Sequence, residues 1–164
     1  CPKSNLKLAS GIADTDTYMK AGINVSIGTD GTASNNTLDM VEEMRFAALL
    51  PKGSLHNPEA VNARTALRMA TINGAKALGI HHLTGSLEVG KRADLIVIHA
   101  DASNMLPIYD VYSAIVYASN SKNIRSSMVN GKWIMRNREL MNINKTETME
   151  SMKHIVNSQI DNRK

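Results

Sequence analysis

The 164-residue sequence predicts an α/β protein, and three observations support this fold class. An alternating segment at residues 23–29 is typical of a strand, and apolar residues at helical spacing follow it up to about residue 80. Short apolar segments then predict strands up to about residue 144, and an amphipathic helix closes the chain. With 43% hydrophobic and 21% charged residues, the composition is that of a globular protein able to bury a core.

The first half of the chain is expected to hold one strand and three helices. Residues 23–29 are expected to form a buried strand that ends at a glycine-rich loop. Asn36 is expected to cap a helix that Pro51 ends. A second helix is expected to begin at the asparagine and proline of residues 57–58, and a third to end at Gly79.

The second half of the chain carries mainly strand and turn signals. Residues 95–98 form a continuous apolar run, and residues 114–119 form a second run of strand length. Asn130-Gly131 separates two further segments, and this pair is typical of a two-residue β-hairpin turn. Asn144 is followed three residues later by a glutamate, a variant of the capping box, so a helix is expected to follow it.

The net charge of +4 is unevenly distributed along the chain. Residues 1–120 carry 10 basic and 11 acidic residues, whereas residues 121–164 carry 9 basic and 4 acidic ones. Because the basic residues are scattered and only 4% of residues are aromatic, a solvated face is a better interpretation than a nucleic-acid site. No apolar run approaches the roughly 18–20 residues of a membrane helix. One cysteine and no visible signal peptide favour the cytoplasm.

Asp30 lies between two glycines, directly after the expected strand. Aspartate–glycine pairs are common in turns, so a purely structural role is one interpretation. The loop that follows is small and polar, and in parallel α/β folds such a loop lies at the carboxyl edge of the sheet, where active sites are built. A carboxylate there can bind a divalent metal or accept a proton from metal-bound water. The residues alone leave both interpretations open.

No second motif completes a metal site or a phosphate-binding loop. "GSLEVGKR", residues 85–92, is close to a phosphate-binding loop, but Arg92 replaces the hydroxyl residue that binds magnesium, and the motif precedes a strand instead of following one. Ligands that share a metal with Asp30 are therefore expected outside this sequence. The histidines lack metal-ligand spacing and are His56, His81, His82, His99 and His154.

Several collinear segments together resemble the amidohydrolase superfamily: "CPKSNLKLASGI", "AGINVSIGTDGTASNN" with "LDMVEEMRFAALL", "ALRMATINGAKALGI" and "GSLEVGKRADLIVI". Within it, the sequence is similar to the 5′-methylthioadenosine/S-adenosylhomocysteine deaminases and to the chlorohydrolases. The resemblance implies the C-terminal part of a (β/α)8 metal-dependent hydrolase barrel. Residues 1–80 would be the last β/α units of the barrel, residues 81–144 part of a small β-sandwich, and residues 145–164 a C-terminal amphipathic helix.

The resemblance also implies a role for individual residues. Enzymes of this superfamily use one divalent metal, zinc or iron, held by an H-x-H pair, two later histidines and an aspartate. "IGTDG" matches the last of these positions, so Asp30 is expected to bind the metal and to take a proton from the attacking water. Ser34 matches a position that lines the substrate pocket, and Ser4 and Asn5 match a pair that supports the site. The histidines and a proton-shuttling glutamate are expected before Cys1, so most metal ligands lie outside this chain.

The leading functional hypothesis is hydrolytic deamination of an adenine nucleoside, such as methylthioadenosine or S-adenosylhomocysteine. A small nucleoside-like substrate and a homo-oligomer are expected, with no nucleic-acid or membrane partner. An alternative within the superfamily is an s-triazine chlorohydrolase or a guanine- or cytosine-type deaminase. A different class of function is a catalytically inactive fragment that acts as an assembly module, because a partial barrel leaves sheet edges unpaired.

Overall fold

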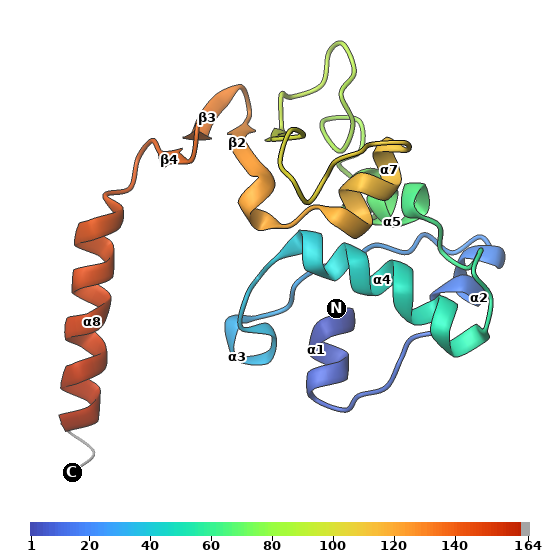
Figure 1. Ribbon diagram of the computed structural model, residues 1–164, viewed down its shortest axis with the longest axis horizontal. Coiled ribbons are helices and arrows are strands. Elements are labelled where there is room, and N and C mark those ends of the chain that lie inside the picture. The colour runs from blue at the N-terminus through green and yellow to red at the C-terminus, as the bar shows by residue number, and fades with distance from the viewer. Residues whose placement is uncertain (162–164) are drawn as a thin grey trace.

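The computed structural model describes residues 1–161, with α4 at its centre (Figure 1). The helices of the first half are α1 (Pro2–Lys7), α2 (Thr15–Lys20), α3 (Thr32–Asn35), α4 (Met40–Leu55), α5 (Ala63–Met69) and α6 (Ile72–Ala77). Those of the second half are α7 (Val111–Ser113), the π-helix η1 (Ala114–Ala118), the 3-10 helix η2 (Ser121–Asn123) and α8 (Lys145–Asp161). The strands β1 (Leu95–Ile98), β2 (Ile124–Val129), β3 (Lys132–Arg136) and β4 (Glu139–Leu140) form one antiparallel sheet in that order.

The hydrophobic core lies where α4, α5 and η1 meet. Several of its side chains are alanines, which let the helix backbones approach closely, and Met69 and Val116 fill the remaining space with no exposed surface. Arg45 of α4 donates hydrogen bonds to the carbonyls of Val116 and Ser119, so it also holds η1 against the core. The buried members of the cluster are Val41, Met44, Ala47, Ala48, Val61, Ala63, Ala66, Met69 and Val116.

The prediction of a buried strand at residues 23–29 is wrong for the described part of the chain. The segment is unpaired with any strand, and its side chains are exposed or half-buried. Its backbone contacts with the core side are a bond from the Ile27 N–H to the Met69 carbonyl (3.2 Å) and one from the Asn73 amide to the Val25 carbonyl (2.9 Å). A strand needs neighbouring strands for its backbone groups, and residues 1–161 place none beside this segment.

Three predicted helix boundaries in the first half are also wrong. The N-cap of α4 is Asp39, not Asn36, because the Asp39 carboxylate accepts hydrogen bonds from two backbone N–H groups of the first turn. Pro51 lies inside α4 and is buried, and the helix continues for one more turn. Asn57 caps only a short turn, whereas α5 begins after Asn62, whose side chain accepts from a backbone N–H of the first turn.

The third predicted helix is confirmed as α6, and Gly79 follows it with φ of +72°. This left-handed conformation ends a helix without steric cost only at glycine, which explains why the glycine is a useful signal there.

In the second half, the predicted hairpin is confirmed. Asn130-Gly131 joins β2 to β3, and both residues have positive φ, as a type I′ turn requires. The strand predicted at residues 95–98 is confirmed as β1 and pairs with β2. The helix predicted behind Asn144 is confirmed as α8, with the Asn144 side chain accepting from the backbone N–H of Glu147 (3.3 Å).

The strand predicted at residues 114–119 is wrong, because this run continues α7 as the π-helix η1. The backbone N–H of Ser119 donates to the Ala114 carbonyl (2.9 Å), a five-residue spacing. A short apolar run does not distinguish a strand from a buried helix. Here Asp110 caps α7 by accepting from the Ser113 N–H (2.7 Å), so the chain is already helical when it enters the apolar run.

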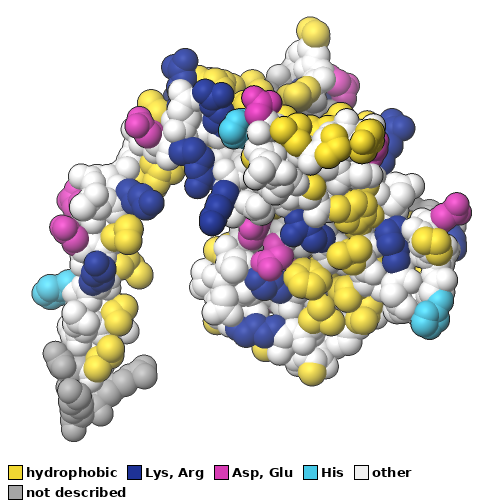
Figure 2. Space-filling view, in the orientation of Figure 1, with side chains coloured by type: hydrophobic (Ala, Val, Ile, Leu, Met, Phe, Trp, Pro, Cys, Tyr) yellow, Lys and Arg dark blue, Asp and Glu magenta, His cyan; other side chains and the backbone are white. Residues whose placement is uncertain are grey.

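Helix α8 extends away from the rest of the chain, and a row of hydrophobic side chains lies along it (Figures 1 and 2). These side chains are between 47% and 55% exposed and belong to Met149, Met152, Ile155, Val156 and Ile160. Within residues 1–161, no helix is both long and apolar enough to cross a membrane. The segment boundaries at residues 80 and 144 stay predictions, and residues 162–164 of the last predicted segment lie outside the described residues.

Candidate functional site

Asp30 lies between the extended segment 23–29 and α3 (Thr32–Asn35). Its φ of +62° lies in the left-handed region, which aspartate adopts more readily than most residues other than glycine. Gly31 is then extended and forms the N-cap of α3. The Asp30 side chain is exposed at the end of the extended segment. The structure thus presents the Asp30 carboxylate directly before a short helix.

Ser34, four residues after Asp30, contacts the carboxylate directly. Its hydroxyl donates to Asp30 Oδ2 at 2.6 Å and also lies 3.1 Å from the Gly31 carbonyl. The hydrogen bond from Ser34, and after it one from the Gly31 backbone N–H, lower the pKa of Asp30 below its ordinary value, and the Ser4 hydroxyl adds to this effect. Asp30 is therefore ionised at neutral pH, which is the state that a metal ligand requires.

Ser4 and Asn5, the two residues expected to support the site, both lie on α1 but have different surroundings. Ser4 is almost fully buried, and its hydroxyl lies 3.4 Å from the carbonyl of Thr29, the residue before Asp30. Asn5 lines a hollow beside Val25 and Met69 instead. Within residues 1–161, no hydrogen bond joins the Asn5 side chain to Asp30 or Ser34. The structure therefore brings Ser4, Ser34 and Asp30 together and places Asn5 next to them.

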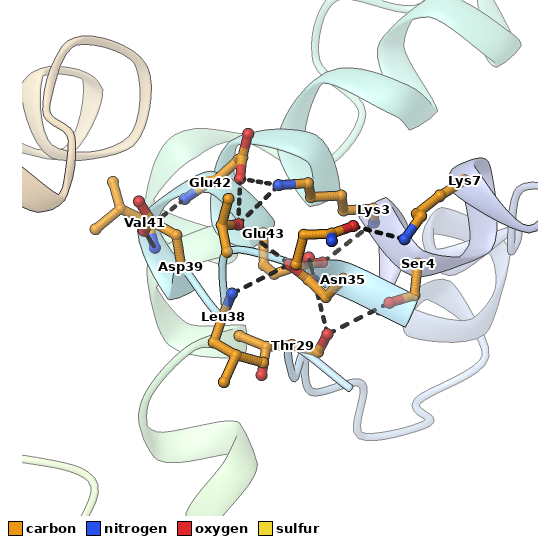
Figure 3. A network of polar contacts seen from close by, with 12 residues as sticks. Lys3, Ser4, Lys7, Thr29, Asn35, Leu38, Asp39, Val41, Glu42 and Glu43 are labelled. Carbon is orange, nitrogen blue, oxygen red and sulfur yellow. Dashed lines mark hydrogen bonds and ion pairs between the residues drawn. The ribbon is translucent and has the colours of Figure 1, made fainter. Parts of the chain in front are cut away.

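A buried polar pair beneath the loop was not predicted from the sequence (Figure 3). Asn35 is 1% exposed and Glu43 of α4 is 0% exposed. The Asn35 amide nitrogen donates to the Thr29 carbonyl at 2.6 Å and to Glu43 Oε1 at 2.5 Å. A signal for Glu43 exists in the sequence: it lies one turn before Ala47 and two before Pro51, so it falls on the buried stripe of the helix.

Two lysines of α1 bind the same loop (Figure 3). The backbone N–H of Lys3 donates to Glu43 Oε2 at 3.2 Å, and its ammonium group forms an ion pair with Glu42. The hydrogen bond from Lys3 holds the pKa of Glu42 below its ordinary value. The Lys7 ammonium donates to Asn36 Oδ1 at 2.5 Å. Helix α1 is thus bonded to the Asp30–Glu43 region at Asn36 and at Glu43.

Asp30 fits a divalent metal as a single anionic oxygen ligand. It is ionised, exposed, and oriented by Ser34 on one oxygen. Within residues 1–161, no group of three or more histidine, cysteine, aspartate or glutamate side chains could hold a metal ion. Protein zinc sites typically use three or four protein ligands, so Asp30 would need further ligands from outside the described residues.

The chain matches a known family of hydrolases. A sequence-family model described as the amidohydrolase family matches residues 1–134. The chain therefore belongs to the amidohydrolase family. It is 47% identical to the 5-methylthioadenosine/S-adenosylhomocysteine deaminase of Acetivibrio thermocellus, over 94% of this chain and 36% of that protein. It is also 47% identical to the 5'-deoxyadenosine deaminase of Methanosarcina barkeri, over 90% and 34%. The chain spans about a third of the length of the curated relatives it matches.

Solved structures show the same likeness. The chain matches an adenosine deaminase from Xanthomonas campestris with bound zinc at a TM-score of 0.92 and 40% identity, covering 94% of this chain and 35% of that one. It matches the atrazine chlorohydrolase from Arthrobacter aurescens, complexed with zinc, at a TM-score of 0.87 and 28% identity, covering 94% and 34%. The predicted fold class is confirmed: the described residues form part of an amidohydrolase fold, with a small antiparallel sheet.

Proposed function

We propose that the whole protein containing this chain is a metal-dependent hydrolase that deaminates an adenine nucleoside, with methylthioadenosine and S-adenosylhomocysteine as the first substrates to test. The observation that supports it most is the Asp30 carboxylate, kept ionised by Ser34 at the end of an extended segment. It occurs in a chain 47% identical to a protein named as a deaminase of these two compounds.

In this proposal Asp30 has two roles, as a metal ligand and as the group that takes a proton from the attacking water. A zinc or iron ion lowers the pKa of bound water, which supplies a nucleophile at neutral pH. Ser34 holds one Asp30 oxygen in place and lines the substrate pocket, while Ser4 and Asn5 support the loop. In the overall reaction the water oxygen bonds to the ring carbon that bears the amino group, one water proton ends on the neighbouring ring nitrogen, and the other ends on the amino group, which leaves as ammonia.

A chimera provides the test of this function. It joins the part of the Acetivibrio thermocellus deaminase that this chain does not match to the present chain, in the order of the relative's own sequence. We expect the zinc-loaded chimera to release ammonia from methylthioadenosine or S-adenosylhomocysteine. A folded, zinc-loaded chimera that releases no ammonia from any adenine nucleoside contradicts the proposal.

A second candidate is s-triazine dechlorination, which the 0.87 TM-score to the atrazine chlorohydrolase supports. The lower identity of 28% makes it the weaker candidate. Guanine- or cytosine-type deamination belongs to the same comparison, so the chimera is assayed for chloride release from atrazine and for ammonia release from both bases. Turnover of one of these compounds above that of the adenine nucleosides would replace the leading candidate.

A third candidate is a catalytically inactive chain of 164 residues that acts as an assembly module. The unpaired segment 23–29 and the exposed hydrophobic side chains of α8 support it. The 164-residue chain by itself is expected to be inactive and to bind zinc weakly, because one carboxylate is too few ligands. The intact mass of the native protein separates the candidates: a mass of 17.9 kDa favours the module, and a mass near that of the relatives favours the enzyme.

The remaining expectations on location and partners belong to the same proposal. We place the protein in the cytoplasm, as a homo-oligomer with no nucleic-acid or membrane partner. The single free cysteine and the scattered basic residues support this placement. Light scattering of the native protein tests the oligomer, and cell fractionation tests the location.

A further inference from the structure

Glu43 is a buried carboxylate with no ionic partner among residues 1–161. Burying such a group costs free energy unless hydrogen bonds replace its hydration. Each of its oxygens accepts one: Oε1 from the Asn35 amide at 2.5 Å and Oε2 from the Lys3 backbone N–H at 3.2 Å. Glu43 therefore joins α4 both to α1 and to residues 29–36, called here the Asp30 loop.

The hydrogen bonds at Glu43 match one orientation of the Asn35 amide. Glu43 Oε1 accepts from the Asn35 NH2 group, and Glu43 Oε2 accepts from the Lys3 backbone N–H. The same NH2 group then donates to the Thr29 carbonyl at 2.6 Å. On its other side, Asn35 Oδ1 accepts from the Leu38 N–H at 3.3 Å and from the Thr37 hydroxyl at 3.2 Å. Every polar atom of the Asn35 side chain is thus used in one orientation.

The Thr29 carbonyl belongs to the same planar peptide group as the Asp30 N–H. A hydrogen bond to this carbonyl therefore fixes the orientation of the Thr29–Asp30 peptide plane. The Asp30 backbone that follows this plane has the sparsely populated φ of +62°. Such a conformation persists only where the surroundings determine it. Asn35 supplies the short hydrogen bond to this carbonyl, and Ser4 supplies a longer one of 3.4 Å.

We infer that Glu43 and Asn35 are positioning residues for the Asp30 carboxylate: Glu43 orients Asn35, and Asn35 holds the Thr29–Asp30 peptide so that Asp30 faces the metal. This inference rests on the proposed function only for the metal, because the hydrogen bonds that carry it lie within the described chain (Figure 3). Neither residue touches the Asp30 side chain, so their effect is transmitted through the backbone.

The test compares Glu43→Gln with Glu42→Gln in the chimera defined above. The Glu43→Gln change introduces an NH2 group at this position, which removes the constraint on Asn35 and places a donor near either Asn35 or the Lys3 N–H. Glu42→Gln removes one charge at the adjacent position and, with it, the ion pair with Lys3, and Glu42 is connected to Asn35 only through the shared Thr37 hydroxyl. Asn35→Ala is the second variant, because it removes the link to Thr29 without altering α4. Thermal unfolding checks that each variant is folded.

Three measurements are made on each variant: zinc affinity by chelator competition, hydrogen exchange of the amides of residues 29–36, and kcat with KM. Residues that orient metal ligands typically contribute 10- to 100-fold to metal affinity, so we expect losses of about that size for Glu43→Gln and Asn35→Ala. We expect faster exchange in the loop, a lower kcat, and a KM within about twofold of the parent, since the pocket itself is retained. Glu42→Gln should stay within about twofold of the parent on all three.

Asp30→Asn separates this inference from the proposed function. If Asp30→Asn loses zinc while folded Glu43→Gln and Asn35→Ala keep the parent's zinc affinity and loop exchange, the positioning role is wrong and the metal-ligand role stands. An equal loss in Glu42→Gln also overturns the positioning role, because general electrostatics would then explain it. If Asp30→Asn keeps its zinc affinity, the proposed function fails, and with it the role toward a metal. Loop exchange requires no metal, so it still decides whether Glu43 orders the loop.

Discussion

The Asp30 loop and helix α8 differ in how much of their hydrogen bonding and hydrophobic burial the described chain provides. The loop is held by hydrogen bonds to Ser4 and Lys7 of α1 and to Glu43 of α4, and both Asn35 of the loop and Glu43 are buried. Helix α8 extends away from the same body with a row of hydrophobic side chains about half exposed (Figures 1 and 2). Segment 23–29 is also incompletely satisfied, because no strand among residues 1–161 pairs with it, although Val25 and Ile27 pack against the core.

The difference follows from the range and the area that each kind of interaction needs. A hydrogen bond needs one donor and one acceptor at close range, and the loop finds all of its partners within residues 3–43. Burial of a hydrophobic face needs a large complementary surface, and residues 1–161 supply none to α8. The hydrogen bonds that hold the Asp30 loop are therefore made within this chain, whereas α8 and segment 23–29 are expected to pack against surfaces that the described residues do not include.

The largest expected effect is the loss of Asp30 itself. Asp30→Ala in the chimera removes both the metal ligand and the proton acceptor, so kcat/KM should fall by roughly 10²- to 10⁴-fold. Ser34→Ala leaves the carboxylate but removes its 2.6 Å hydrogen bond, and we expect a loss of roughly tenfold. Steady-state kinetics of ammonia release measures both. Equal losses in the two variants would mean that Ser34 does more than orient Asp30.

The next effect concerns the core that carries the loop. Met69 of α5 has no exposed surface and packs in the core cluster with side chains of α4, so Met69→Ala should lower the free energy of unfolding by about 2–5 kcal/mol. Urea denaturation of the 164-residue chain, followed by circular dichroism, measures this change. A decrease below about 1 kcal/mol would show that the core of the isolated chain is less well packed than its structure indicates.

The same substitution in α8 is a matched control that also sharpens the comparison. Met152 is 55% exposed, so Met152→Ala should change the free energy of unfolding of the isolated chain by less than about 0.5 kcal/mol. If α8 packs against the remainder of a full-length protein, the same change in the chimera should cost about 1–3 kcal/mol. An equally small effect in both proteins would leave a second copy as the partner to examine, by light scattering of the chimera and of the isolated chain.

The smallest effect belongs to the sheet. Asp94 accepts a hydrogen bond from the backbone N–H of Asn130 at 2.5 Å and one from the Thr84 hydroxyl at 2.7 Å, and these bonds, the first above all, lower its pKa below the ordinary value of 3.8. Because the pKa is lower in the folded state, the contribution to stability is complete above pH about 3.8 and is lost as the pH falls through the folded-state pKa.

Titration of the Asn130 amide resonance between pH 2 and pH 6, a range set around the roughly 3.9 of a free aspartate, should therefore show its midpoint below 3.8. Asp94→Asn should remove this titration. A midpoint above 3.8 would mean that the hairpin turn is not held by the Asp94 carboxylate in solution.

Where the structure agrees with the sequence, the deciding interactions are local. Asn130-Gly131 sets the hairpin because both residues accept positive φ, and Gly79 ends α6 for the same reason. Asn144 caps α8 through a residue three positions away. The contact between Asp30 and Ser34 also spans only four residues. Such signals depend on a few neighbouring residues and can be recognised in the sequence without knowledge of the tertiary structure.

Where the structure differs from the sequence-based expectation, contacts between distant segments decide. The run at residues 114–119 is a π-helix because α7 leads into it and Arg45 of α4 holds its carbonyls, across 71 residues from Arg45 to Val116. Segment 23–29 has the alternation of a strand but no neighbour to pair with among the described residues. In the sequence Glu43 is one of several acidic residues of a helix, whereas in the structure it is fully buried and contacts α1.

The sequence by itself determined the family, the β2–β3 hairpin and the helices α6 and α8, because each is carried by adjacent residues or by collinear motifs. Only the tertiary structure decided that Glu43 is buried and that it binds the Lys3 backbone N–H, 40 residues away. The physical reason is that burial changes what a charge does. A carboxylate exposed to water is screened and adaptable, whereas one removed from water must satisfy each oxygen with a fixed donor, and those donors then fix the loop that carries Asp30.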